Sequence, residues 1–254
     1  MLPRRQSARM LLITFAVVVL VRIAAIPLNS TLALVCAWFT VPLLIELLWV
    51  STDRPRSPHV RWWLASLAFL LVLDVATTLL AGELRLLVAA LALGLAAMAQ
   101  VAALWPERRA TILAEERGWL WLYVAGLSLV GFAVTYSEAA HESGGTGAAV
   151  AAAAVAAAAA GIFATALGPR GTGGGIFGFM AVLVILISSV LGNEGTAATM
   201  GAVILGVAGQ GLILLTILQR EERGVPERRA TLRAERQRTL LVAEHQWDEL
   251  LTAP

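Results

Sequence analysis

Residues 62–81 read WWLASLAFLLVLDVATTLLA, and Asp74 is the one charged side chain in this run. A helix rises about 1.5 Å per residue, so a run of this length can cross about 30 Å of hydrocarbon. Similar runs recur along the whole chain, in which 59% of the residues are hydrophobic and 14% are charged. A soluble domain of this length needs more polar surface, so the sequence predicts an integral membrane protein.

Apolar segments of sufficient length occupy most of the chain. Lipid offers the backbone no hydrogen-bond partners, so each crossing should be helical, and no segment shows the alternating pattern of a membrane β-strand. We therefore expect an all-α, polytopic membrane helix bundle over residues 1–219, with eight transmembrane helices. The predicted spans are 10–28, 31–51, 62–81, 84–105, 118–137, 147–168, 174–192 and 197–219.

The arginines predict how the bundle is oriented. Seventeen of the nineteen basic residues fall on one side of the eight spans, and Arg85 is the one arginine in the loops of the other side. The positive-inside rule then places both termini in the cytoplasm. The alanine-rich span 147–168 is the weakest, but omitting it would move the arginine-rich tail to the other side. All basic residues are arginine, as in many GC-rich bacterial genomes, so we expect a multi-pass protein of the bacterial inner membrane.

Ionisable residues inside the spans are the first candidates for a functional site, because charge in hydrocarbon is costly unless it is paired or hydrated. Arg22 and Asp74 each lie twelve residues from the inner end of their helix. Both therefore sit about 18 Å into the membrane, and we expect an ion pair between the first and third helices.

Glu46 and Gln100 form a second candidate layer nearer the inner surface. Each lies about five residues from the inner end of its helix, roughly 10 Å below the level of Arg22 and Asp74. Two readings stay open. The four residues could form a stepped path for a proton or ion, or the ion pair could simply fix the order of the helices.

The remaining side chains predict no cofactor and no metal site. Cys36 is the single cysteine, and His59, His141 and His245 all fall in predicted loops or the tail. Thiolate metal cages and membrane haem sites need more ligands than these. We also expect the glycines between residues 161 and 178 to form a tight turn, and Gln210 to tie the eighth helix to a neighbour.

An arginine-rich element occurs twice. Residues 106–111 read PERRAT, as do residues 226–231, and each copy follows a fourth span. This pattern is compatible with a parallel repeat of residues 1–117 and 118–236. We expect Arg108, Arg109, Arg228 and Arg229 to contact anionic lipids of the inner leaflet. The interleaved glutamates nearly cancel the positive charge, which argues against nucleic-acid binding.

Residues 220–254 form the predicted cytoplasmic tail. Leu240, Ala243, Trp247 and Leu250 would lie along one edge of an otherwise polar helix. We expect this amphipathic helix to dock on its own bundle or on another subunit, with Trp247 as the anchor.

No sequence motif identifies a reaction, so the expected functions follow from this architecture. The first expectation is a non-catalytic integral membrane subunit of a multi-subunit complex, with a proton or ion path through the first four helices. The alternative is a small stand-alone ion or solute transporter. Lesser alternatives are an intramembrane enzyme acting on a lipid or isoprenoid, and a membrane input module of a signalling system. Enzymatic activity is the less expected outcome, because the chain has no convergent acids and no metal-binding cluster.

Overall fold

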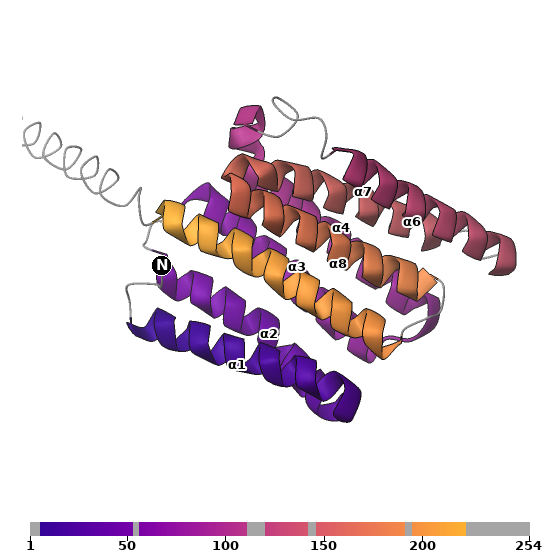
Figure 1. The fold of residues 1–254 in the computed structure, drawn as a ribbon, viewed down its shortest axis with the longest axis horizontal. Helices are drawn as coiled ribbons and strands as arrows, with labels where there is room; N and C mark the ends of the chain where they lie inside the picture. Colours follow the sequence, from indigo (N-terminus) through magenta and orange to yellow (C-terminus); the bar gives the residue numbers. More distant parts are fainter. Residues whose placement is uncertain (1–5, 53–55, 111–119, 142–145, 191–194, 222–254) are drawn as a thin grey trace, which may run out of the picture. The chain divides into compact units, whose positions relative to one another are not determined.

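The computed structural model describes residues 6–52, 56–110, 120–141, 146–190 and 195–221, and every element in these ranges is a helix (Figure 1). The α-helices are α1 (Gln6–Leu28), α2 (Ser30–Ser51), α3 (Pro58–Leu79), α4 (Gly82–Leu104), α6 (Leu120–His141), α7 (Thr146–Ala164), α8 (Pro169–Val190) and the last described helix, Thr196–Glu221. Two short 3₁₀ helices, η1 (Trp105–Ala110) and η3 (Thr165–Leu167), follow α4 and α7. The prediction of an all-α fold is confirmed.

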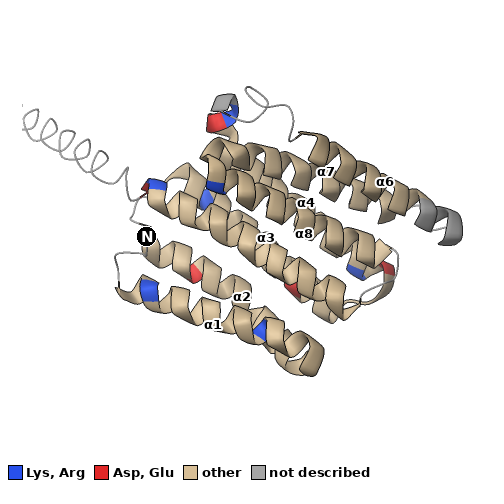
Figure 2. Ribbon diagram, viewed as in Figure 1, with Lys and Arg blue, Asp and Glu red and all other residues tan. Residues whose placement is uncertain are grey.

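Seven helices in the described ranges are long and apolar enough to cross a membrane. The remaining α-helix, α6, coincides with the predicted span 118–137, but its apolar part, Leu120–Thr135, is shorter. Figure 2 shows long uncharged stretches in each helix. The chain is therefore a multi-pass helical membrane protein. The number of crossings and the side on which the termini lie stay predictions.

The chain divides into two compact units, Met1–Thr216 and Ile217–Pro254. All packing considered below lies within the first unit. The described part of the second unit is residues 217–221, the end of the last helix. The predicted tail beyond residue 221, with Arg228, Arg229 and Trp247, lies outside the described residues.

Local capping sets where the first helices begin. α1 and α2 are separated by Asn29 alone, whose side-chain Oδ1 accepts a hydrogen bond of 3.1 Å from the backbone N–H of Leu32. Ser57 caps α3 in the same way, by accepting from the backbone N–H of Val60, and Pro58 occupies the first turn. These residue types satisfy N–H groups that a helix start leaves without partners.

The helices of the first unit pack mostly on their neighbours in sequence. α1 packs on α2, α2 on α3 and α3 on α4, whereas α7 packs on α6 and α8 (Figure 1). The contact between α4 and α7 joins the first four helices to the later ones. Gly94 of α4 faces Ala153 of α7, where an added Cβ would lie 3.7 Å from the Ala153 Cα. The two helix backbones are therefore close together.

The alanine-rich helix α7 is the most buried of the seven spans. In its span, 67% of the residues are buried, compared with 17% in α1. Small side chains allow α4, α6 and α8 to approach the α7 backbone, so its many alanines fit a central position in the bundle. The weakest predicted span is thus a long apolar helix at the centre of the packing.

The expected glycine-rich turn between residues 161 and 178 is wrong in extent. Gly168, with φ of +86°, lies between η3 and α8, but Gly173, Gly174 and Gly175 lie inside α8. An added Cβ on Gly175 would lie 2.6 Å from the carbonyl oxygen of Gly161. Most of these glycines therefore allow close helix packing, which a sequence run alone does not distinguish from a turn.

Candidate functional site: a cavity between the two groups of helices

A cavity of about 860 Å³ lies inside the first unit. One wall is formed by residues of α1, α2, α3 and α4, and the other by residues of α7, α8 and the helix Thr196–Glu221. α6 contributes Val134. Cavities that hold small molecules have volumes of roughly 300–1,000 Å³, so this one has room for a ligand of that class.

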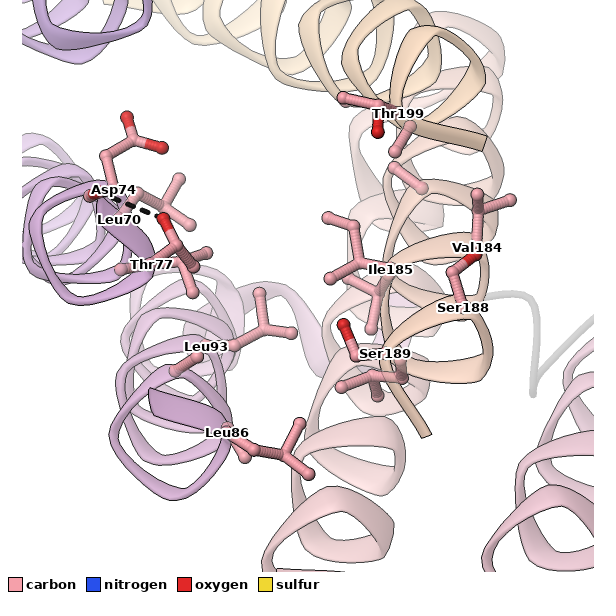
Figure 3. Close-up of a pocket in the computed structure, with 18 of the residues that line it drawn as sticks. Leu70, Asp74, Thr77, Leu86, Leu93, Val184, Ile185, Ser188, Ser189 and Thr199 are labelled. Carbon is pink, nitrogen blue, oxygen red and sulfur yellow. Dashed lines mark hydrogen bonds between the residues drawn. The ribbon is translucent and has the colours of Figure 1, made fainter. Parts of the chain in front are cut away.

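The lining is largely apolar, with a minority of polar side chains from every wall. Leucine, valine and alanine side chains make most of the surface. Figure 3 shows Asp74 and Thr77 of α3 on one side and Ser188, Ser189 and Thr199 on the other. The polar lining residues are Arg22, Thr40, Asp74, Thr77, Glu83, Arg85, Thr146, Ser188, Ser189, Thr199 and Gln210.

The cavity extends from the ends of several helices into the interior of the bundle. Glu83 is the second residue of α4, Thr146 is the first residue of α7, and Val190 is the last residue of α8. Gln210 lies fourteen residues into its helix, about 21 Å from the helix start. The lining residues therefore extend from the helix ends at one end of the bundle to beyond the middle of the last helix.

Arg22 is held against α2. Its guanidinium Nη1 donates to the Thr40 hydroxyl over 3.5 Å, and that hydroxyl donates to the carbonyl oxygen of Cys36 over 2.9 Å. Thr40 is buried, with 4% of its surface exposed. The arginine is thus positioned at the cavity wall by a polar residue of the neighbouring helix.

Asp74 has a different environment. The hydroxyls of Thr77 and Thr78 donate to the main-chain carbonyl of Asp74, over 3.0 and 2.8 Å. They therefore do not donate to the Asp74 carboxylate. The carboxylate atom Oδ2 is buried and accepts no hydrogen bond. The Trp38 indole N–H donates to Thr78 over 3.4 Å and so links α2 to this turn of α3.

The expected ion pair between Arg22 and Asp74 is not formed, although the two side chains line the same cavity and attract each other electrostatically. α1 packs on α2 and α2 packs on α3, so the arginine reaches Thr40 of the intervening helix first. The structure therefore places two opposite charges near each other at a cavity and gives neither a charged hydrogen-bond partner.

The structure does not bring Glu46 and Gln100 together. The Gln100 side-chain amide donates to Ser66 over 3.0 Å, and both side chains are buried between α4 and α3. Glu46 lies on the exposed face of α2. Matching depth along two helices does not determine which faces point at each other, and this is why the sequence argument failed here.

Gln210 lies on the cavity wall. Among the described residues, its buried side-chain oxygen Oε1 accepts no hydrogen bond from a neighbouring helix, contrary to expectation. Ala198, Ala202 and Gly206 recur every four residues along the last helix and also line the cavity, and an added Cβ on Gly206 would lie 3.6 Å from the Ala181 Cβ of α8. Small residues here allow the last helix to contact α8 and also leave room for the cavity beside that contact.

Arg108 lies in η1, away from the cavity lining. Its guanidinium donates to the Trp105 carbonyl over 3.4 Å and stands 5.3 Å from the centre of the Trp105 ring. The Arg109 side chain lies outside the described residues. Lipid contact by either residue stays a prediction.

Several cavity residues were missed by the sequence argument. Thr40, Ser188, Ser189 and Thr199 are uncharged, and serine and threonine are common in membrane helices, so their signal was weak. The polar pair at residues 188–189 near the end of an apolar span was the strongest available hint.

Comparison with known proteins identifies no relative. No protein-family model matches this chain, and searches of curated proteins and of solved structures gave no match. The candidate function therefore rests on the cavity itself.

Proposed function

We propose that this protein binds a small solute in the cavity between its two groups of helices and carries that solute across the membrane. The cavity, with Arg22, Asp74 and Gln210 on its walls, is the observation that supports this proposal. A ligand site typically combines apolar walls with a few polar groups that set orientation, and this lining has that composition. Intramembrane charges that face a cavity are commonly part of a solute or ion pathway.

The same observations give less support to a stepped proton path through the first four helices. Such a path would require polar groups to continue from Asp74 toward Glu46 and Gln100. Gln100 is engaged with Ser66, and Glu46 lies on the exposed face of α2. A wide cavity that also includes the later helices fits a solute better than a relay along the earlier ones.

Location and orientation belong to this proposal. We place the protein in a bacterial inner membrane with both termini in the cytoplasm, because the arginines are concentrated on one side of the spans. The helix ends that border the cavity then face outward. A green fluorescent protein fused after Pro254 should fluoresce in cells, whereas alkaline phosphatase fused there should be inactive.

Cysteine accessibility tests the proposal directly. In a Cys36→Ala background, Ser188→Cys and Thr199→Cys place thiols on the cavity wall. Both should react with a membrane-impermeant methanethiosulfonate added outside intact cells. Ser128→Cys is the control, since Ser128 is exposed on α6 but is absent from the cavity lining. It should not react, because it would face lipid.

Carrier function makes a further demand. Gln210→Cys, deep in the cavity, should react from the outside in cells and also from the inside in inverted vesicles, as an alternating cavity requires. If the cavity thiols are no more reactive than the Ser128→Cys control, the cavity does not open to water and the proposal fails.

Glu46 supports a second candidate function, that of a membrane subunit in a larger complex. Its carboxylate lies among exposed apolar side chains of α2, including Phe39 and Trp49, which are 56% and 46% exposed. A carboxylate is costly against lipid, and a partner helix with an arginine or lysine would remove that cost. Purification from native membranes in mild detergent should then yield a stoichiometric partner that is lost in Glu46→Leu.

A further inference from the structure

Among the described residues that line the cavity, the positive and negative side chains are equal in number. The charged lining residues are two arginines, Arg22 and Arg85, and two acids, Asp74 and Glu83. Arg22 and Asp74 lie within the bundle, whereas Glu83 and Arg85 lie in the first turn of α4. An ion of either sign would leave this low-dielectric site with an unbalanced charge, and such an imbalance is costly.

Arg22 and Asp74 attract each other electrostatically, but among the described residues neither donates or accepts a hydrogen bond with a charged side chain. The described contact of Arg22 is the neutral Thr40 hydroxyl, and the Asp74 atom Oδ2 accepts no hydrogen bond. Gln210, from the other group of helices, adds a second buried acceptor without a donor. Buried polar groups are normally satisfied, so two orphaned acceptors at one cavity indicate a ligand that brings donors.

A molecule that carries both an ammonium and a carboxylate has the complementary chemistry. The ammonium offers N–H donors for the Asp74 carboxylate, and a carboxylate matches the fork of N–H groups on the Arg22 guanidinium. Such a molecule has no net charge, so it leaves the site neutral. The remaining walls are apolar, with Leu70, Leu73, Leu93, Val182 and Val203 among them.

We propose that the cavity selects a small zwitterion with an apolar side chain, of the class that apolar amino acids and short apolar peptides represent. This inference rests on the proposed function, because it names the class of solute that the cavity binds. Arg22 holds the carboxylate end and Asp74 the ammonium end, while the leucine and valine walls receive the apolar part. A neutral site with separated charges would discriminate against molecules that have either charge alone.

A matched set of probes tests this. L-leucine and leucyl-leucine have both charges, isoamylamine is leucine without its carboxylate, and isocaproate is leucine without its ammonium. Thermal unfolding of the full chain in lipid nanodiscs measures binding, since a ligand of the folded state raises the midpoint. At least one zwitterion should bind about tenfold or more tightly than isoamylamine and isocaproate, because charged hydrogen bonds carry that much affinity.

Variants identify which residue holds which end. Arg22→Gln should reduce zwitterion affinity about tenfold or more without weakening isoamylamine binding, because the variant removes a positive charge from the site. Asp74→Asn should likewise reduce zwitterion affinity without weakening isocaproate binding, because it removes a negative charge. Arg22→Lys and Asp74→Glu keep the charges and should restore part of the affinity, which separates ligand contact from misfolding. Glu46→Gln, outside the cavity, should bind as the parent does.

Two results would overturn the inference. Isoamylamine or isocaproate binding as tightly as the zwitterions would mean a site for a single charge. If none of the four probes shifts the unfolding midpoint, but the cavity thiols react with the impermeant reagent, the zwitterion inference is rejected. The proposal that the cavity binds some solute would then still stand. Unreactive cavity thiols would instead reject the proposed function itself, so the two failures are distinguishable.

Discussion

Gln100 of α4 donates a 3.0 Å hydrogen bond to Ser66 of α3, and both side chains are buried. The same two helices are also joined by a hydrogen bond between the His59 ring Nδ1 and the main-chain carbonyl of Ala103. A buried amide that loses its partner pays the cost of desolvation without the bond that offsets it. This pair is therefore a buried polar contact that contributes to the packing of α3 on α4.

Replacing one member of that pair should cost more than replacing both. Ser66→Ala should lower the free energy of unfolding by about 1–2 kcal/mol, because it strands the Gln100 amide. The double variant Ser66→Ala with Gln100→Leu should recover most of the loss. Denaturation in mixed micelles with a double-mutant cycle measures the coupling. A coupling of zero would show that the bond does not hold α3 to α4.

Two glycines of α8 form a matched pair for testing close helix packing. An added Cβ on Gly175 would lie 2.6 Å from the Gly161 carbonyl, whereas one on Gly173 would make an ordinary contact of 3.8 Å with Leu212. Gly175→Ala should lower the unfolding free energy by about 1–3 kcal/mol through overpacking. Gly173→Ala should be neutral or slightly stabilising, since alanine favours helix. Thermal unfolding compares them, and equal midpoints would contradict the close α7–α8 approach.

Asp74 should be a residue that binding needs and stability does not. Its Oδ2 atom is buried and accepts no hydrogen bond, so Asp74→Asn removes a poorly satisfied charge. We expect the unfolding free energy to be unchanged or raised by up to about 2 kcal/mol, while zwitterion binding falls. Thermal unfolding without ligand provides the check. A large loss of stability would mean that Asp74 stabilises Arg22 as a structural pair after all.

The Asn29 cap between α1 and α2 gives a local test. Asn29→Ala removes the acceptor for the Leu32 N–H and should cost about 1 kcal/mol. Asn29→Asp keeps an acceptor oxygen at the same place and should cost less. Chemical denaturation of the two variants beside the parent measures the difference. Equal effects would show that the loss comes from something other than the cap.

Much of the fold could be predicted along the chain because membrane crossing is a local property. A run such as residues 62–81 must become a helix in lipid, whatever surrounds it, and the predicted spans agree with the described helices to within a few residues at most ends. Orientation could likewise be argued from arginines, although it stays a prediction. Gly161 and Gly175 mark the limit of such reasoning, because their role depends on which helix backbones meet.

The candidate site was predicted only in part. Arg22 and Asp74 were identified because charge inside an apolar run stands out in any sequence. The predicted ion pair between them was wrong, because equal depth in the membrane does not show that α2 lies between α1 and α3. Ser188 and Thr199 were missed because the wall they form appears only when α8 and the last helix face α3.

By itself, the sequence determined that the chain forms apolar helices and that it places a few charges within them, since both follow from the cost of polar groups in hydrocarbon. Only the tertiary structure decided that Arg22 bonds Thr40, that Gln100 bonds Ser66, and that Glu46 faces outward. It also decided that residues of the first four helices and residues of α7, α8 and the last helix line one cavity. These depend on helix rotation and neighbour choice, which arise from side-chain packing across the whole bundle.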